Sequence, residues 1–139
     1  MFNSSLRKSL EVSENKRQEA ESVIDAIKQS IATVEFTPEG KVLYANTLLL
    51  KAVGYSLNEV VGQHHKLFCS ATYANSPAYQ QFWSNLKACH PQEGHFARVN
   101  KNGQEIWLRA TYFPVKQAGK VVKIMNTASE ITQYKQQLD

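Results

Sequence analysis

The sequence has little cysteine and no long apolar run, and each of these features excludes a class of protein. Only two cysteines, Cys69 and Cys89, occur in 139 residues, too few for the disulfide framework of a small secreted domain. The longest apolar stretch, residues 45–54, is broken by polar side chains and is too short to span a bilayer. The first ten residues lack the apolar segment and cleavage site of a signal peptide. We therefore expect a cytoplasmic protein without direct membrane insertion.

Clustered charge and catalytic motifs are also missing. The net charge is +4, but the basic residues between 41 and 123, Arg98 among them, are scattered as on a solvated surface. Nucleic-acid binding usually needs a basic stripe, so none is expected. The chain has no serine nucleophile elbow, no phosphate-binding glycine loop and no close pair of carboxylates. Cys69 and Cys89 lack the close pairing of zinc ligands. We expect neither an enzyme nor a metal site.

The first thirty residues have the composition of a helix. Residues 4–28 contain no glycine or proline and are rich in Glu, Gln, Lys and Ala. Their apolar pattern alternates steps of four and three, the spacing of a coiled coil. The positions in this row are Leu6, Leu10, Ser13, Arg17, Ala20, Ile24, Ile27 and Ile31. Two interpretations stay open, a homodimer seam weakened at Ser13 and Arg17, or a helix packed on its own domain.

From Ile31 onward the pattern predicts an α+β domain. Two strands surround the turn Thr37-Pro38-Glu39-Gly40, short helices follow, and three strands are joined at Asn102-Gly103 and Ala118-Gly119. A further helix begins after Thr132. We expect an N-terminal helix over 1–30, a sensor-like domain over 31–132, and a linker over 133–139 that leads to a downstream domain.

This order of elements and several local motifs resemble the PAS family. "EGKVLYAN…GYSLNEVVGQHH" is similar to the PAS opening, and "KNGQEIWLRATYFPV" with "GKVVKIMNTASEIT" is similar to its closing strands. Within PAS, the chain resembles the aerotaxis-receptor group (Aer) and the related tandem-PAS chemoreceptors of the BdlA type. The resemblance implies a five-stranded antiparallel sheet with short helices on one face. It also implies a homodimer and a downstream chemoreceptor signalling domain.

The resemblance further implies a cofactor. Aer-type domains bind FAD non-covalently and report its redox state, so FAD is the expected cofactor. Haem b, with His65 or Cys69 as axial ligand, is the alternative, and a cofactor-free dimerisation module is a third. In light-sensing LOV domains a cysteine stands where this chain has His65, so a photochemical thiol adduct is not expected.

Seven residues are candidates for the cofactor site. An imidazole at His65 can hydrogen-bond a flavin, although His64 and His65 could instead end a helix and cap carbonyls. Alternation places Trp107 on the face opposite Ile106 and Leu108, and the family pattern favours Trp107 as the inward, cofactor-facing residue. The other five candidates are Asn46, which also suits a helix N-cap, Asn126, which a flavin's pyrimidine edge could pair, and Tyr73, Phe82 and Trp83.

Overall fold

The computed structural model describes residues 3–135 of the chain. The chain divides after Ser30 into two compact units, which are described separately here. Among the described residues, no helix combines the length and the apolarity that crossing a membrane requires.

The first unit is a single long helix, α1 (Ser4–Ser30), as the composition predicts. None of its residues is buried, and its apolar side chains Leu6, Leu10, Ile24 and Ile27 are between 42% and 54% exposed. Arg17, at one of the weak positions of the heptad row, forms ion pairs with Glu14 and Glu21. The pairing of this row with a second copy stays a prediction.

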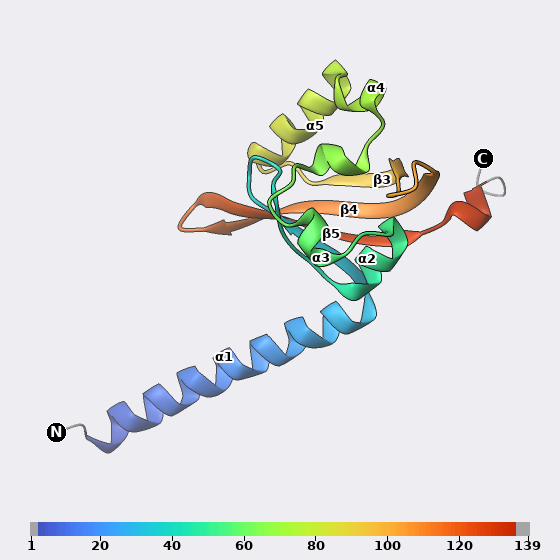
Figure 1. Ribbon diagram of the computed structural model, residues 1–139. Helices are drawn as coiled ribbons and strands as arrows, with labels where there is room; N and C mark the ends of the chain where they lie inside the picture. Colours follow the sequence, from blue (N-terminus) through green and yellow to red (C-terminus); the bar gives the residue numbers. More distant parts are fainter. Residues whose placement is uncertain (1–2, 136–139) are drawn as a thin grey trace. The chain divides into compact units, whose positions relative to one another are not determined.

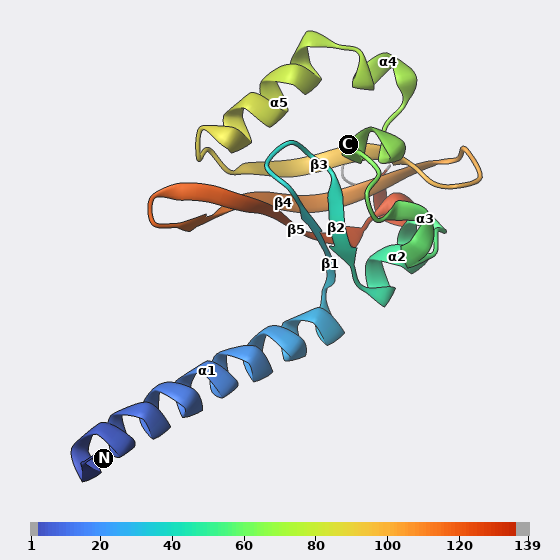
Figure 2. The ribbon, with the colours of Figure 1, turned by 60° about the vertical axis from the view of Figure 1, so that its left-hand side comes forward.

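The second unit is built on the predicted five-stranded antiparallel sheet. Its strands lie in the order β2-β1-β5-β4-β3, with β2 and β3 at the edges (Figures 1 and 2). The bounds are β1 Ala32–Phe36, β2 Val42–Ala45, β3 Gln92–Val99, β4 Glu105–Gln117 and β5 Lys120–Glu130. All four pairings are antiparallel. The α+β fold class is confirmed.

Short helices connect β2 to β3. They are α2 (Thr47–Val53), α3 (Leu57–Val60), the 3₁₀ turn η1 (His65–Phe68), α4 (Ala71–Ala74) and α5 (Pro77–Lys87). Capping side chains start several of them: Asn46 for α2, a Ser56–Glu59 capping box for α3 and Ser76 for α5. A last 3₁₀ turn, η2 (Thr132–Tyr134), follows β5. The end of the expected linker, residues 136–139, lies outside the described residues.

One face of the sheet and the helices share a single core. Alternation in β4 buries Ile106, Leu108, Ala110 and Tyr112, and these pack in one cluster with side chains of α2 and α5. In β5, Ile124, Asn126 and Ala128 face the same way and are buried. The family resemblance implies a cofactor held in this core, so the buried polar side chains of the core define the candidate site.

Candidate functional site

His65 lies at the centre of the core and is the start of a buried polar chain. It is the first residue of η1, and only 1% of its surface is exposed. Its Nδ1 lies 2.8 Å from the Tyr79 hydroxyl of α5, and its Nε2 lies 2.9 Å from the Tyr112 hydroxyl of β4. The Cys69 sulfur is 3.6 Å from Nδ1. The imidazole therefore bridges the helical layer and the sheet.

This series of hydrogen bonds continues to a buried cation, Arg98. Arg98 of β3 donates from Nη2 to the Tyr112 hydroxyl oxygen at 3.1 Å and from Nη1 to the Ala97 carbonyl at 2.9 Å. Because Tyr112 accepts from Arg98, its own proton is best used toward His65 Nε2. That assigns the single N–H proton of the neutral imidazole to Nδ1, which then donates to the Tyr79 hydroxyl oxygen.

Burial sets the protonation states of the hydrogen-bonded cluster around His65. It lowers the pKa of His65 well below 6.5, and the nearby Arg98 charge lowers that pKa further. Burial also raises the pKa of the Tyr112 hydroxyl, although Arg98 opposes that shift, and it raises the pKa of the Cys69 thiol. At neutral pH the imidazole, the phenols and the thiol are thus all neutral, and Arg98 carries the only charge of the cluster.

Aromatic rings enclose His65. The rings of Trp83 and Phe36 meet it edge-on at centroid distances of 5.5 and 5.3 Å, and Phe82 stacks against it at 6.1 Å. Phe82 also meets the Tyr112 ring at 4.8 Å. Such contacts fix ring orientations as well as excluding water, so the predicted residues His65, Phe82 and Trp83 are brought together in one packed cluster.

Asn126 faces a small cavity beside this cluster. Register places it between Val34 of β1 and Tyr112 of β4. The cavity has a volume of about 10 Å³ and is lined by ten residues, His65, Arg98 and Asn126 among them. The Asn126 Oδ1 and the Arg98 Nε are both buried and have no hydrogen-bond partner. Buried polar atoms without partners are rare in native proteins, and here the two residues that carry them line one cavity.

Two residues predicted for the cofactor site, Asn46 and Trp107, have other roles in the fold. The side-chain amide of Asn46 forms hydrogen bonds within the protein. Its Oδ1 accepts from the Thr33 and Leu49 backbone amides, and its Nδ2 donates to the Ile31 carbonyl. It serves as the N-cap of α2, the alternative that the sequence left open.

The expectation that Trp107 faces inward is wrong. Its neighbours Ile106 and Leu108 take the core face, and the Trp107 indole lies on the opposite face with Nε1 donating to Glu105 at 3.0 Å. The Lys135 ammonium lies 4.2 Å from the centre of its ring. The Trp107 backbone also binds the segment after β5, because its carbonyl accepts from Ile131 and its amide donates to the Thr132 hydroxyl.

The sequence reasoning missed the residues that hold His65. Arg98 was expected on the solvated surface, yet it is only 2% exposed. Its place on the same strand face as Gly94 and Phe96 was the available signal, because that face turns inward. Tyr79 and Tyr112 carried no separate signal. His64 and His65 do not end a helix; His64 begins η1 by accepting from the Lys66 amide.

The donor set suits an organic ligand better than a metal. Among residues 3–135, no group of three or more His, Cys, Asp and Glu side chains is arranged to hold a metal ion. Both nitrogens of His65 are already within hydrogen-bond distance of tyrosine hydroxyls, so iron ligation by His65 would first have to break one of these bonds.

Comparisons with known proteins agree with the architecture. Residues 42–128 match a family described as the PAS fold. The biofilm dispersion protein BdlA of Pseudomonas aeruginosa is 37% identical over 119 residues, which are 85% of this chain and 28% of BdlA. The aerotaxis receptor of Escherichia coli is 29% identical over 91 residues, which are 66% of this chain and 18% of the receptor. The chain thus spans less than a third of either relative.

Solved structures share the fold at low sequence identity. A light-oxygen-voltage domain studied with a flavin analogue superposes with a TM-score of 0.68 at 17% identity, over 84% of this chain and 90% of that one. A PAS domain from Colwellia psychrerythraea gives 0.71 at 16% identity, over 82% and 98% of the two chains.

Proposed function

This chain belongs to the PAS family, and from that premise we propose that it is the cytoplasmic sensor domain of a chemotaxis-type signal transducer. The domain binds FAD non-covalently in its core and reports redox or oxygen state to a downstream signalling domain. The flavin supplies reversible uptake of electrons, and the residues of the chain hold it and pass on its state. The two curated relatives described above support this reading, because one is an aerotaxis receptor and the other is the biofilm dispersion protein.

One observation carries the cofactor proposal: the buried Asn126 Oδ1 has no partner. A buried carbonyl oxygen without a hydrogen bond costs about 1–3 kcal/mol. A flavin's pyrimidine edge carries an N–H that can donate to it. Phe36 and Phe68 supply aromatic surface to the same space, and His65 supplies a neutral imidazole that can donate or accept. These residue types fit the hydrogen-bonding pattern of the ring.

Space sets a condition on that fit. Ligand pockets for molecules of this size usually exceed about 300 Å³, whereas the cavity at Asn126 has about 10 Å³. The packed rings around His65 must therefore move apart to admit a flavin. Binding is then coupled to the bonds that His65 makes with Tyr79 and Tyr112, which gives the core a way to register occupancy.

The visible spectrum of freshly purified protein tests the proposal. A flavin gives a yellow protein with near-ultraviolet and blue bands, and Asn126→Ala should weaken its retention. An intense Soret band would instead identify haem, and a colourless protein that also fails to bind added FAD would contradict the cofactor proposal. Conversion of Cys69 to Ser serves as the control for photochemistry, since we expect no thiol adduct in blue light from either protein.

We also propose that the chain forms a homodimer through the heptad row of α1. Four large apolar side chains of that row are more than 40% exposed in the single chain, and pairing two copies would bury them. Ile24→Asp should shift the molecular mass measured by light scattering toward the monomer. Asp25→Asn, a neighbouring change outside the row, should leave it unchanged. A monomeric wild-type chain at high concentration would refute the seam.

A further inference from the structure

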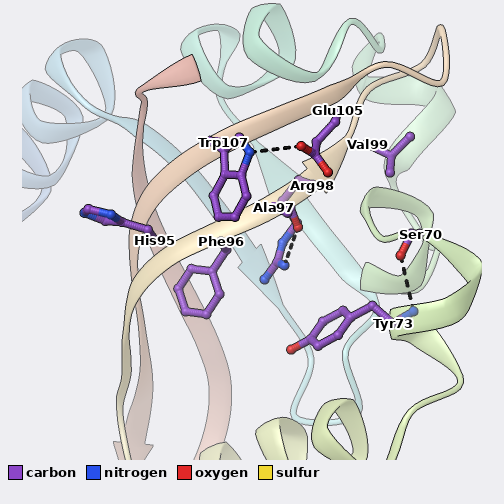
Figure 3. Close-up of a pocket in the computed structure, with 9 residues that line it drawn as sticks. All are labelled: Ser70, Tyr73, His95, Phe96, Ala97, Arg98, Val99, Glu105 and Trp107. Carbon is purple, nitrogen blue, oxygen red and sulfur yellow. Dashed lines mark hydrogen bonds between the residues drawn. The ribbon is translucent and has the colours of Figure 1, made fainter. Parts of the chain in front are cut away.

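A second, larger cavity lies along the free edge of β3, outside the cavity at Asn126. It has a volume of about 280 Å³ (Figure 3). Ser70 and Tyr73 line it from the start of α4, Phe96 and Arg98 from β3, and Glu105 and Trp107 from β4. We call it the β3-edge pocket. It contains two of the residues expected at the cofactor, Tyr73 and Trp107, but it opens at the edge of the sheet.

Arg98 is the unusual member of this pocket. It is a cation with 2% of its surface exposed, and it makes no ion pair with any residue that the structure describes. A buried charge without a partner of opposite sign is costly. Two of its nitrogens donate to neutral oxygens, those of Ala97 and Tyr112, and its Nε has no partner. The guanidinium therefore retains both donor capacity and an uncompensated charge.

Aromatic rings flank the Arg98 guanidinium where it borders the pocket. Figure 3 shows the guanidinium between Phe96 and Tyr73, whose ring centres lie 4.8 and 5.8 Å from its central carbon. These contacts with ring faces stabilise the cation in part and restrict its rotamers. An arginine held in this way is pre-organised for a carboxylate, which it binds through two parallel hydrogen bonds.

We propose that the β3-edge pocket binds a small organic carboxylate with an aromatic or apolar body. The acid group of the ligand pairs with Arg98, and the body lies on the aromatic walls supplied by Tyr73 and Phe96, which flank the guanidinium. The one acidic side chain of the described pocket lining, Glu105, accepts from the Trp107 indole and so has a partner already. This site goes beyond the flavin proposal and does not depend on it.

The position of Arg98 connects such a ligand to the core. Arg98 lines both the β3-edge pocket and the small cavity at Asn126, and its Nη2 bonds to Tyr112, which bonds in turn to His65. A carboxylate that draws the guanidinium toward the pocket weakens the Arg98–Tyr112 bond. The buried chain is then altered from outside, without a ligand having to enter the packed core.

Nuclear magnetic resonance of the whole chain tests the site with phenylacetate as the probe. Arginine Nε–H groups that are buried give separate resonances, so Arg98 can be followed directly. We expect phenylacetate to shift the Arg98 Nε–H and the β3 amides saturably. Phenylacetamide, which has the same ring but no charge, should bind at least about tenfold more weakly, the effect of losing about 1.4 kcal/mol.

A matched pair of variants completes the test. Arg98→Gln should abolish saturable binding of phenylacetate, while Arg109→Gln, at an exposed cation of the neighbouring strand, should leave it intact. If Arg98→Gln fails to fold, the comparison of phenylacetate with phenylacetamide on the wild-type chain still tests the proposal. The proposal is overturned if phenylacetate gives no saturable shift, if both probes bind equally, or if the two variants lose binding alike. None of these outcomes bears on the flavin spectrum.

Discussion

Tyr112 is the residue whose loss tests the buried chain most sharply. Its hydroxyl is bonded to two buried groups at once, the charged Arg98 Nη2 at 3.1 Å and the neutral His65 Nε2 at 2.9 Å. Tyr112→Phe removes one oxygen and preserves the ring, which packs against Phe82 and Phe96. The substitution therefore isolates the polar contribution from the aromatic packing.

The magnitude follows from the groups left behind. Each buried polar group that loses its only partner costs about 1–3 kcal/mol, and a charged one costs more. Two such groups predict a loss of about 2–5 kcal/mol in the free energy of unfolding, out of a usual total of about 5–15 kcal/mol. Tyr79→Phe is the matched control, because it removes the hydroxyl beside His65 Nδ1 and leaves the bond between Arg98 and Tyr112 in place. It should cost about 1–2 kcal/mol.

Urea unfolding of both variants measures these values. A real loss of stability lowers the midpoint with an unchanged dependence on urea, whereas a change in that dependence would indicate an altered denatured or native state. We expect Tyr112→Phe to cost about twice as much as Tyr79→Phe. Equal costs, or a cost of Tyr112→Phe below about 0.5 kcal/mol, would show that the His65–Tyr112–Arg98 chain does not hold the core together.

Three further predictions concern the glycine turn, pH and the outer face. Gly40→Ala should lower the free energy of unfolding measured in urea by about 2–4 kcal/mol, because Gly40 has φ +97° and a Cβ there would lie 2.7 Å from the nearest side-chain atom. Gly62→Ala is the control: Gly62 has φ +82° and no atom within 4 Å of the added Cβ, so it should cost only about 1 kcal/mol. Because the pKa of His65 is far below 6.5 in the folded chain, the unfolded chain takes up the proton first, and stability should fall by about 1.4 kcal/mol between about pH 7.5 and about pH 5.5. His65→Gln should remove most of this loss, and the remainder comes from His64, whose pKa burial also lowers; a loss of unchanged size in His65→Gln would contradict a neutral buried imidazole. Trp107→Leu, on the outer face, should leave flavin absorbance per chain unchanged, and a bleached variant would place that indole at the cofactor.

Much of the fold could be predicted from local signals. The turns Thr37-Pro38-Glu39-Gly40 and Asn102-Gly103 fall at the ends of observed strands, since these residues suit positive φ angles or fixed bends. Alternation in residues 105–112 separated Ile106 and Leu108 from Trp107 correctly. The row of Trp107 also contains Glu105, Arg109 and Thr111, and the expectation that it faced inward came from the family pattern. The tertiary packing instead buries the more apolar row.

The site was predicted less completely, for a physical reason. His65, Phe82, Trp83 and Asn126 do gather in the core, but the groups that bind His65 come from a separate helix and strand. Arg98 is the clearest case, since a lone arginine in a sequence is usually solvated. Its burial depends on a hydroxyl fourteen residues away and on two rings, Phe96 of its own strand and Tyr73 of α4. Such long-range compensation leaves little trace in the local pattern.

Transmission from the core to the exit of the domain is the claim on which the sensor function depends. Asn126 lies on β5, six residues before Thr132, and the backbone of Ile131 is bonded to Trp107 across the sheet. A change at the Asn126 amide can therefore alter the strand that leads into η2. Such a shift biases a two-state arrangement by a few kcal/mol at most.

Hydrogen exchange of residues 124–135 in the oxidised and the reduced holoprotein measures this directly. The account predicts that reduction changes protection in this segment in the wild-type chain, and that Asn126→Ala with flavin restored to full occupancy loses most of that change. Redox-dependent protection of equal size in the wild type and in Asn126→Ala, or no redox dependence in the wild type, would contradict it.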